Sequence, residues 1–189
     1  MNFLTRFYCV LMGFEIKPGT DLQKANLAKA NLKDANLRGA IMGRANLTRA
    51  NLSQADLSRA FLVGAKLVRA KLVGANLSGA NLRGADFGEA DLSGADLGRT
   101  DLSATILSGA NLKGADFSGA ALSGAKLDDA NLIGADFSGA KLSGAKYNKG
   151  TKWPKGYDPK AAGAELISTK RKSPSPTKKK RAKEKKRPA

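Results

Sequence analysis

The sequence contains no histidine and only one cysteine, Cys9, among its 189 residues. Histidine is the commonest general base and metal ligand, and a single cysteine forms neither an intramolecular disulfide nor a cysteine-based metal cluster. Aromatic residues amount to only 6%, too few for a conventional aromatic core. No segment approaches the roughly 18 consecutive apolar residues of a membrane-spanning helix. Most familiar catalytic chemistry is therefore excluded, and we expect no cofactor and no metal.

Positive charge, in contrast, is abundant. Lys and Arg number 33 against 16 Asp and Glu, which gives a formal net charge of +17. The last 20 positions, 170–189, hold 11 of these Lys and Arg and one acid, so the rest of the chain carries +7. Such an excess concerns partners and solubility rather than fold, and it indicates an acidic partner.

The dominant pattern is a repeat of five residues. From Thr20 to Lys149 the sequence reads as 26 consecutive pentapeptides, with Ala first in 23, Asn or Asp second in 17 and Leu third in 21. On an α-helix successive leucines would lie about 140° apart, and on a straight strand they would alternate between faces. If the chain turns a corner in each pentapeptide, Ala and Leu both point toward one axis. The repeat therefore predicts an all-β solenoid.

Units such as Ala25-Asn26-Leu27-Ala28-Lys29 and Ala75-Asn76-Leu77-Ser78-Gly79 resemble those of the pentapeptide-repeat family, over about two thirds of the chain. The resemblance implies a right-handed quadrilateral β-helix with four pentapeptides per coil, here about 6.5 coils. It also implies that Leu and the preceding Ala lie inside and the other three positions outside. Phe117 and Phe137 lie 20 residues apart, so we expect their rings to stack in consecutive coils.

Both ends of a solenoid need caps. Residues 1–19 are rich in apolar side chains and predict an N-terminal cap, rather than a secretion signal, although Met12 rather than Met1 is an alternative start. Residues 150–169 predict a C-terminal cap, with a short helix from Lys160 to Ser168 after Pro159. The Thr151–Pro159 segment resembles the closing segment of many cyanobacterial-type pentapeptide proteins. Residues 170–189 have almost no apolar side chain, which predicts a disordered basic tail.

Two basic regions are candidate binding sites for a polyanion, either nucleic acid or an anionic membrane surface. Seven cations in the amino-terminal half of the repeats form a basic collar: Lys24, Lys29, Arg38, Arg44, Arg49, Arg59 and Arg69. The tail supplies Lys170, Arg171, Lys172, Lys178, Lys179, Lys180, Arg181, Lys183, Lys185, Lys186 and Arg187. The tail also reads as a nuclear-import signal if the source is eukaryotic or a nucleus-using virus; otherwise we expect a cytoplasmic protein. Ser173 and Ser175 precede prolines and resemble phosphorylation sites.

An exposed apolar girdle is the alternative binding surface. Ile41, Phe61, Val63, Val68 and Val73 occupy outward positions of the repeat, and such a cluster predicts a protein partner. A homodimer through a wall or an end of the rod is a related expectation.

A solid rod has no cleft in which catalytic groups could converge, so we expect no enzyme. Some members of the family imitate duplex DNA and bind type II topoisomerases. This sequence departs from them because it is basic and no insertion interrupts its 26 units, so DNA mimicry is a less favoured hypothesis than either kind of binding above. The sequence thus predicts a non-enzymatic scaffold tethered to a polyanion by its tail. The alternative is a protein-interaction rod that uses the apolar girdle, with the tail as a localisation signal only.

Overall fold

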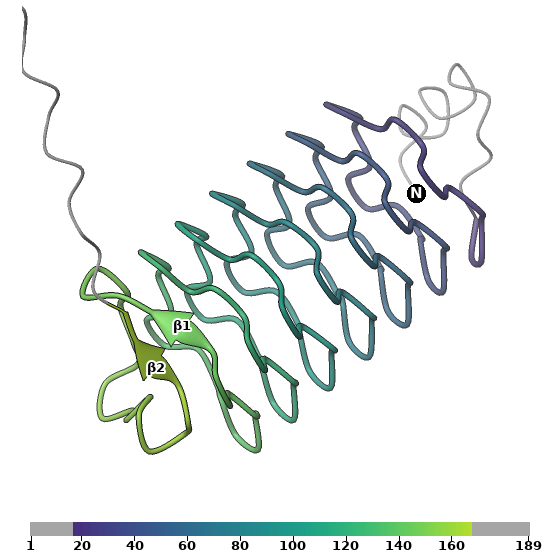
Figure 1. Ribbon diagram of the computed structural model, residues 1–189. Helices are drawn as coiled ribbons and strands as arrows, with labels where there is room; N and C mark the ends of the chain where they lie inside the picture. Colours follow the sequence, from purple (N-terminus) through teal and green to yellow (C-terminus); the bar gives the residue numbers. More distant parts are fainter. Residues whose placement is uncertain (1–16, 168–189) are drawn as a thin grey trace, which may run out of the picture.

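The computed structural model describes residues 17–167, which form a rod of stacked coils (Figure 1). The rod is a β-helix, as the repeat predicts. Residues 1–16, most of the expected N-terminal cap, and the basic tail lie outside the described residues.

Parallel pairing between coils fixes the register. Isolated bridges join Asp21 with Ile41, Asn26 with Asn46 and so on to Lys126 with Lys146, always 20 residues apart. Four pentapeptides therefore complete one coil, and each supplies one side. The main chain bonds in both directions: Leu27 N–H donates to Asn46 O at 2.7 Å and Asn46 N–H donates to Ala25 O at 2.9 Å. The sides behave as very short parallel strands, each stacked on the side one coil earlier.

Each corner is a β-turn. Leu27 O accepts the N–H of Ala30 at 3.0 Å, and Lys29, the second residue inside the turn, has φ of 61°. A positive φ at this place is typical of type II turns and favours glycine. About half of the corners hold glycine, and twelve described non-glycine residues adopt the same conformation, including Lys24, Arg44 and Glu89. The corner therefore accepts long charged side chains, which point away from the axis.

Alanine and leucine fill the axis of the rod. Leu32, Leu77 and Leu97 are completely buried, and so are nearly all the alanines that precede such residues. Each buried Leu stabilises the fold by about 1.5–3 kcal/mol, but only when the coils above and below cover it. Thr100 and Thr105 replace Ala, and their buried hydroxyls donate to Leu97 O and Leu102 O at 2.6 Å. The inward placement of Ala and Leu is thus confirmed.

The Asn or Asp of each unit closes the turn that follows it. Asn46 Oδ1 accepts the N–H of Thr48 at 3.1 Å, and Asp96 Oδ1 accepts that of Gly98 at 2.9 Å. Asn and Asp suit this place because their side chains reach the backbone two residues on. Asparagines also join successive coils, as Asn46 Nδ2 donates to Asn26 Oδ1 at 3.2 Å.

Three consecutive sides lack this device. Phe61, Lys66 and Lys71 stand where Asn or Asp would be. Within residues 17–167 no acceptor is found for the N–H groups two residues on, those of Val63, Val68 and Val73. This coil therefore has three corners in a row without the side-chain bond that closes the turn elsewhere.

Aromatic side chains gather at the carboxyl end of the rod. The expected stacking of Phe117 on Phe137 is confirmed, with ring centroids 4.8 Å apart and planes inclined by 5°. Phe137 also packs against Trp153 and Tyr157, at 5.6 and 4.9 Å, and Tyr147 meets Trp153 edge-on at 5.4 Å. Phe137, Tyr147, Trp153 and Tyr157 thus close the axis where no further coil follows.

Two short strands end the described chain: β1 (Lys146–Tyr147) and β2 (Glu165–Leu166), which pair in parallel (Figure 1). The expected helix from Lys160 to Ser168 is wrong over the described residues 160–167. Residues 159–163 form a single turn, in which Ala164 N–H donates to Pro159 O at 2.9 Å. Gly163, with φ of 87°, ends the turn. The three residues between Pro159 and Gly163 are too few to offset the cost of helix nucleation, and the backbone that follows pairs with β1 instead.

Candidate functional site: the charged outer shell

The side chains inside the described rod are mainly those of Ala and Leu, which carry no reactive group. Within residues 17–167 no three His, Cys, Asp or Glu side chains come together as a metal site would require. No helix in this part of the chain is long and apolar enough to cross a membrane. Because Ala and Leu occupy the axis, any binding site formed by residues 17–167 lies on the outer shell.

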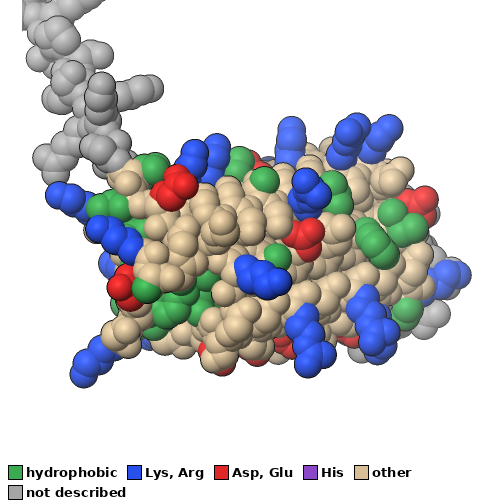
Figure 2. Space-filling view, turned by 60° about the horizontal axis from the view of Figure 1, so that its bottom comes forward, with side chains coloured by type: hydrophobic (Ala, Val, Ile, Leu, Met, Phe, Trp, Pro, Cys, Tyr) green, Lys and Arg blue, Asp and Glu red, His purple; other side chains and the backbone are tan. Residues whose placement is uncertain are grey.

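All seven residues of the basic collar are exposed. Six of them occupy left-handed corners, with φ between 57° and 61°, and Arg38 lies one position before such a corner. The 20-residue register places Lys29, Arg49 and Arg69 on one edge of the rod and Lys24 with Arg44 on the next. Figure 2 shows Lys and Arg side chains standing out along the edges of the rod. A side chain that leaves a convex corner is well placed to reach a partner.

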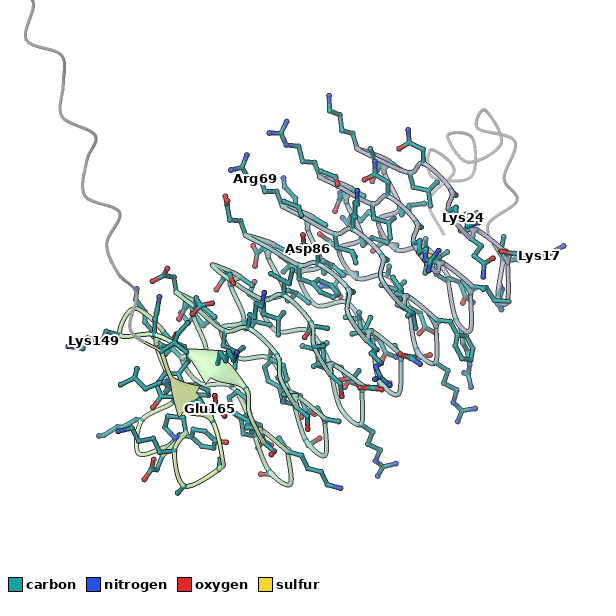
Figure 3. The ribbon with its side chains drawn as sticks, in the orientation of Figure 1. Lys17, Lys24, Arg69, Asp86, Lys149 and Glu165 are labelled. Atoms are coloured by element: carbon teal, nitrogen blue, oxygen red, sulfur yellow. The ribbon has the colours of Figure 1, made fainter. Side chains whose placement is uncertain are left out.

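One collar residue is already paired. Arg69 Nε lies 2.9 Å from Glu89 Oε2, and Arg69 Nη2 donates to Glu89 Oε1 at 3.2 Å (Arg69 is labelled in Figure 3). The hydrogen bond to Glu89 raises the pKa of Arg69 and, in return, lowers the pKa of Glu89. The side chains are 51% and 60% exposed, and exposed pairs contribute little to stability. The pair therefore orients two side chains rather than holding the coil together.

The shell is divided into bands of opposite charge along the rod. Residues 17–83 contain 12 Lys and Arg but only three acids, whereas residues 84–140 contain three Lys and Arg and nine acids. Asp96, Asp116 and Asp136 stack in one column of the second band. The sequence analysis identified the collar but not the banding, which becomes visible when charges are counted coil by coil.

The apolar girdle is centred on one side of the rod. Ile41 and Phe61 are bridged in adjacent coils, and Phe61, Val63 and Ile41 are 52%, 43% and 38% exposed. Val73 is also exposed, on another side, but Val68 is half-buried and contributes less. Ile133 and Leu166 are exposed apolar side chains that the sequence reading missed. The girdle is thus a compact patch on one side with an outlying valine, not a continuous ring.

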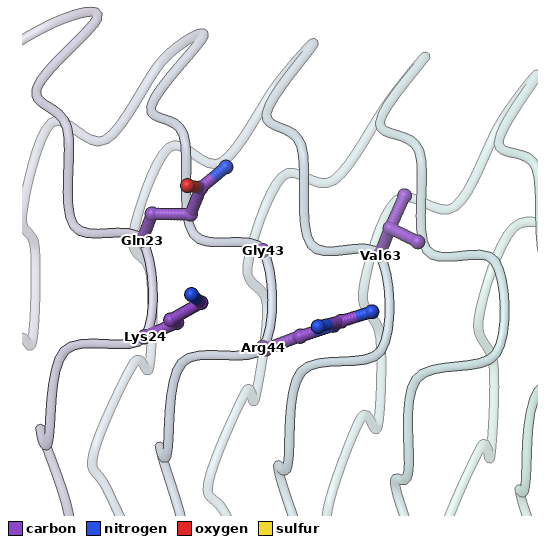
Figure 4. Close-up of a pocket in the computed structure, with 5 residues that line it drawn as sticks. All are labelled: Gln23, Lys24, Gly43, Arg44 and Val63. Carbon is purple, nitrogen blue, oxygen red and sulfur yellow. The ribbon is translucent and has the colours of Figure 1, made fainter.

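A shallow hollow of about 350 Å³ adjoins this patch. Its lining residues come from three successive coils: Gln23, Lys24, Gly43, Arg44 and Val63 (Figure 4). The hollow exists because Gly43 has no side chain between those of Gln23 and Val63. An apolar surface next to two cations suits an acidic partner with an apolar side chain.

A second hollow, of about 360 Å³, lies at the carboxyl end between residues 135–138 and the turn at residues 154–157. Its lining includes the aromatic residues Phe137 and Tyr157 and the charged residues Asp136 and Lys155. Burial raises the pKa of the Tyr157 hydroxyl. All the tail residues expected to bind a polyanion, together with Ser173 and Ser175, lie outside the described residues.

Comparisons with known proteins agree on the fold. A profile described as "Pentapeptide repeats" matches in eight copies, over residues 18–44, 45–84, 70–109, 85–124 and 115–146. A search of curated proteins finds no match.

Several solved structures are similar. A pentapeptide repeat protein from Nostoc PCC 7120 shares 38% identity over 65% of this chain and 84% of its own, with a TM-score of 0.40. One from the thylakoid lumen of Arabidopsis thaliana shares 34% identity over 52% and 66%, with a TM-score of 0.41. HetL, a Nostoc protein involved in the regulation of heterocyst differentiation, shares 28% identity over 87% and 92%, with a TM-score of 0.39. With the repeat matched across most of the rod, the chain belongs to the pentapeptide-repeat family.

Proposed function

We propose that this protein is a non-enzymatic scaffold that binds a polyanion, nucleic acid or an anionic surface, through its basic tail, with the basic collar as a second contact. The proposal divides the chain into caps at residues 1–19 and 150–169, about 6.5 coils over residues 20–149 and a tail at residues 170–189. It places the protein in the cytoplasm, or in the nucleus if the source has one.

The single observation that carries the proposal is the concentration of cations. The tail has 11 Lys and Arg in 20 residues, and the collar adds seven exposed cations. Clustered Lys and Arg displace the counterions of a phosphate backbone, which drives binding without sequence readout. The described rod supports a scaffold role because its axis is filled by side chains and the hollows at Gly43 and at Tyr157 are shallow.

The tail and the collar belong to opposite ends of the rod. β2, the last described strand, lies at the carboxyl end of the rod in Figure 1, and the tail follows it in the sequence, whereas the collar occupies the first coils. From Lys29 to Glu165 the chain advances almost seven coils, or about 32 Å at a strand spacing of ~4.8 Å. The two basic regions therefore suit a polyanion that extends along the rod.

A truncation experiment tests the proposal. We expect the full chain to bind a 30-base-pair DNA duplex, measured by fluorescence anisotropy at low salt, and a chain ending at residue 169 to bind at least tenfold more weakly. Changing Lys24 and Arg44 to Gln in the full chain should cause a smaller loss. Equal binding by the full and truncated chains would remove the tail from the function. Anionic vesicles in place of DNA decide between the two kinds of polyanion.

The second candidate function is protein binding through the apolar patch. It is favoured by the neighbouring exposure of Ile41, Phe61 and Val63 beside the hollow at Gly43. In this case the tail serves as a localisation signal only. Changing Phe61 to Asn should abolish capture of an acidic protein partner without weakening DNA binding. A matched change of the exposed Ile133 to Asn should affect neither.

A further inference from the structure

One edge of the rod carries the two charge bands in a single column. Its left-handed corners repeat every 20 residues, and from the amino end they hold three cations, an acid, a glycine and an acid: Lys29, Arg49, Arg69, Glu89, Gly109 and Asp129. All five charged side chains are exposed. The Arg69–Glu89 pair marks the place where the charge changes sign.

We propose that this edge, with the side of the rod that precedes it, binds a second copy of the chain lying antiparallel. The two-fold axis lies in the plane of contact, perpendicular to both rods and level with the midpoint between Arg69 and Glu89. This operation reverses the order of the column while keeping it on the same edge. Lys29 then faces Asp129 of the other copy, and Arg69 faces Glu89. Arg49 faces Gly109, which has no side chain to oppose it.

The adjoining side of the rod matches under the same operation. Its outward column contains Asn46, Lys66, Asp86 and Ile106 in consecutive coils. Reversal brings Lys66 opposite Asp86 and Asn46 opposite Ile106. At the other edge of this side, Arg44 meets Ala104, and each lies one and a half coils from the midpoint. No like charges face each other, so the whole side is self-complementary.

The edge that holds Arg59 and Arg99 behaves differently. Its corners are otherwise glycines, among them Gly39, Gly79 and Gly119. Reversal about the same level brings Arg59 opposite Arg99, so two cations would meet at each end of the contact. Self-complementarity is therefore a property of one side and not of the repeat in general.

The expected dimer is weak and depends on salt. The contact spans five coils from Lys29 to Asp129, about 24 Å at ~4.8 Å per coil, and it is only one side wide. A contact of this length and width buries less surface than the roughly 1,000 Å² of a stable interface. The net charge of +17 repels the copies at very low salt, and high salt screens the pairs, so association should be strongest near 0.1 M salt, where the Debye length is about 10 Å.

Charge reversal on the full chain tests the proposal. A basic variant carries Glu89→Lys and Asp129→Lys, and an acidic variant carries Lys29→Asp and Arg69→Glu. Left-handed corners of the same rod already hold Lys, Glu and Asp, so these side chains fit, and circular dichroism verifies the fold. Arg59→Glu with Arg99→Glu is the matched control, because it changes the net charge as much as the acidic variant but on another edge.

Sedimentation equilibrium at about 0.1 M salt gives the outcome. We expect the wild type and the control to dimerise, and each reversed variant alone to dimerise at least tenfold more weakly. An equimolar mixture of the basic and acidic variants should regain the wild-type affinity as a heterodimer. A mixture that stays monomeric, or a wild type that stays monomeric at about 0.5 mM at every salt concentration, overturns the proposal.

Zero-length cross-linking with a carbodiimide locates the contact. Lys29 and Asp129 of one chain lie about 24 Å apart at ~4.8 Å per coil, so a bond between them forms only between copies. In a mixture of isotopically light and heavy chains, we expect a mixed peptide that joins Lys29 with Asp129. A dimer whose cross-links avoid this edge would contradict the proposal, whatever its affinity. Neither result bears on DNA binding by the tail, since no polyanion is present, although a polyanion seated on the collar would compete with the second copy.

Discussion

The coil with unbonded corners offers a direct way to stabilise the rod. The described residues supply no acceptor for the N–H groups of Val68 and Val73, because Lys66 and Lys71 stand at the Asn/Asp position. The double change Lys66→Asn and Lys71→Asn provides a side-chain oxygen to each. Asn46 and Asn51 one coil earlier already close their own turns in this way, at 3.1 and 3.2 Å.

The gain follows from two new hydrogen bonds. A typical net contribution of ~0.5–1.5 kcal/mol per bond gives about 2 kcal/mol for the pair. The new amides can also donate to the oxygens of Asn46 and Asn51, as Asn46 does to Asn26. For a chain of this length, about 2 kcal/mol corresponds to a rise in Tm of roughly 4–8 °C.

Urea unfolding followed by circular dichroism measures the free energy of unfolding. The matched control is Lys66→Gln with Lys71→Gln, which removes the same two charges but places the amide one methylene too far out to bond the N–H two residues on. We expect the Asn variant to be more stable than the Gln variant by about 2 kcal/mol. If the two variants are equally stable, the relief of charge repulsion explains the gain and the reasoning on the corners is refuted.

Three further predictions concern exchange, packing and pH. Hydrogen exchange measured by NMR should be fast for the amides of Val63, Val68 and Val73. It should be slow for the amides of Thr48, Ser53 and Ser58, because their N–H groups bond to Asn or Asp oxygens. Equal protection of the two sets would mean that the side-chain bonds do not close the turns. Phe137→Ala should cost about 3–5 kcal/mol in urea unfolding and change the fluorescence of Trp153, because Phe137 packs on three aromatic rings, whereas Ile133→Ala on the surface should do neither. The Ser103 hydroxyl bond lowers the pKa of Asp101 below its usual 3.8, aided by the Ser103 N–H and by Arg83 and opposed by partial burial. A lowered pKa adds stability above pH 4 that is lost as the pH falls through the folded-state value. Because the Ser103 hydroxyl causes the shift, Ser103→Ala should raise the pKa of Asp101 in a carboxyl NMR titration. Ser123→Ala, one coil further on, should leave the pKa of Asp101 unchanged.

Much of the rod could be predicted because one repeat determines each coil. The spacing of Ala and Leu was sufficient to place both on the axis, and the 20-residue interval between Phe117 and Phe137 predicted their stacking. Such inferences succeed because every coil has the same neighbours, so a local pattern and its tertiary environment repeat together.

The ends and the corners were harder to predict. The segment after Pro159 has helix-forming residues, but its backbone pairs with β1 once Gly163 ends the turn. One additional residue near Gly150 shifts the last bridge to 21 residues, Asn131 with Lys152. No periodic pattern signals either event, because each depends on contacts made once only. The Arg69–Glu89 pair was likewise missed, although its 20-residue spacing in the sequence could have shown it.

The salt dependence of DNA binding tests most directly whether the charged parts outside the filled axis decide what this protein binds. A plot of log K against log salt has a slope of about −0.9 for each duplex phosphate neutralised. With 11 cations in the tail, we predict a steep negative slope for the full chain and a slope closer to zero, by several units, for a chain ending at residue 169. Binding that is independent of salt, or equal slopes for the two chains, would contradict the account.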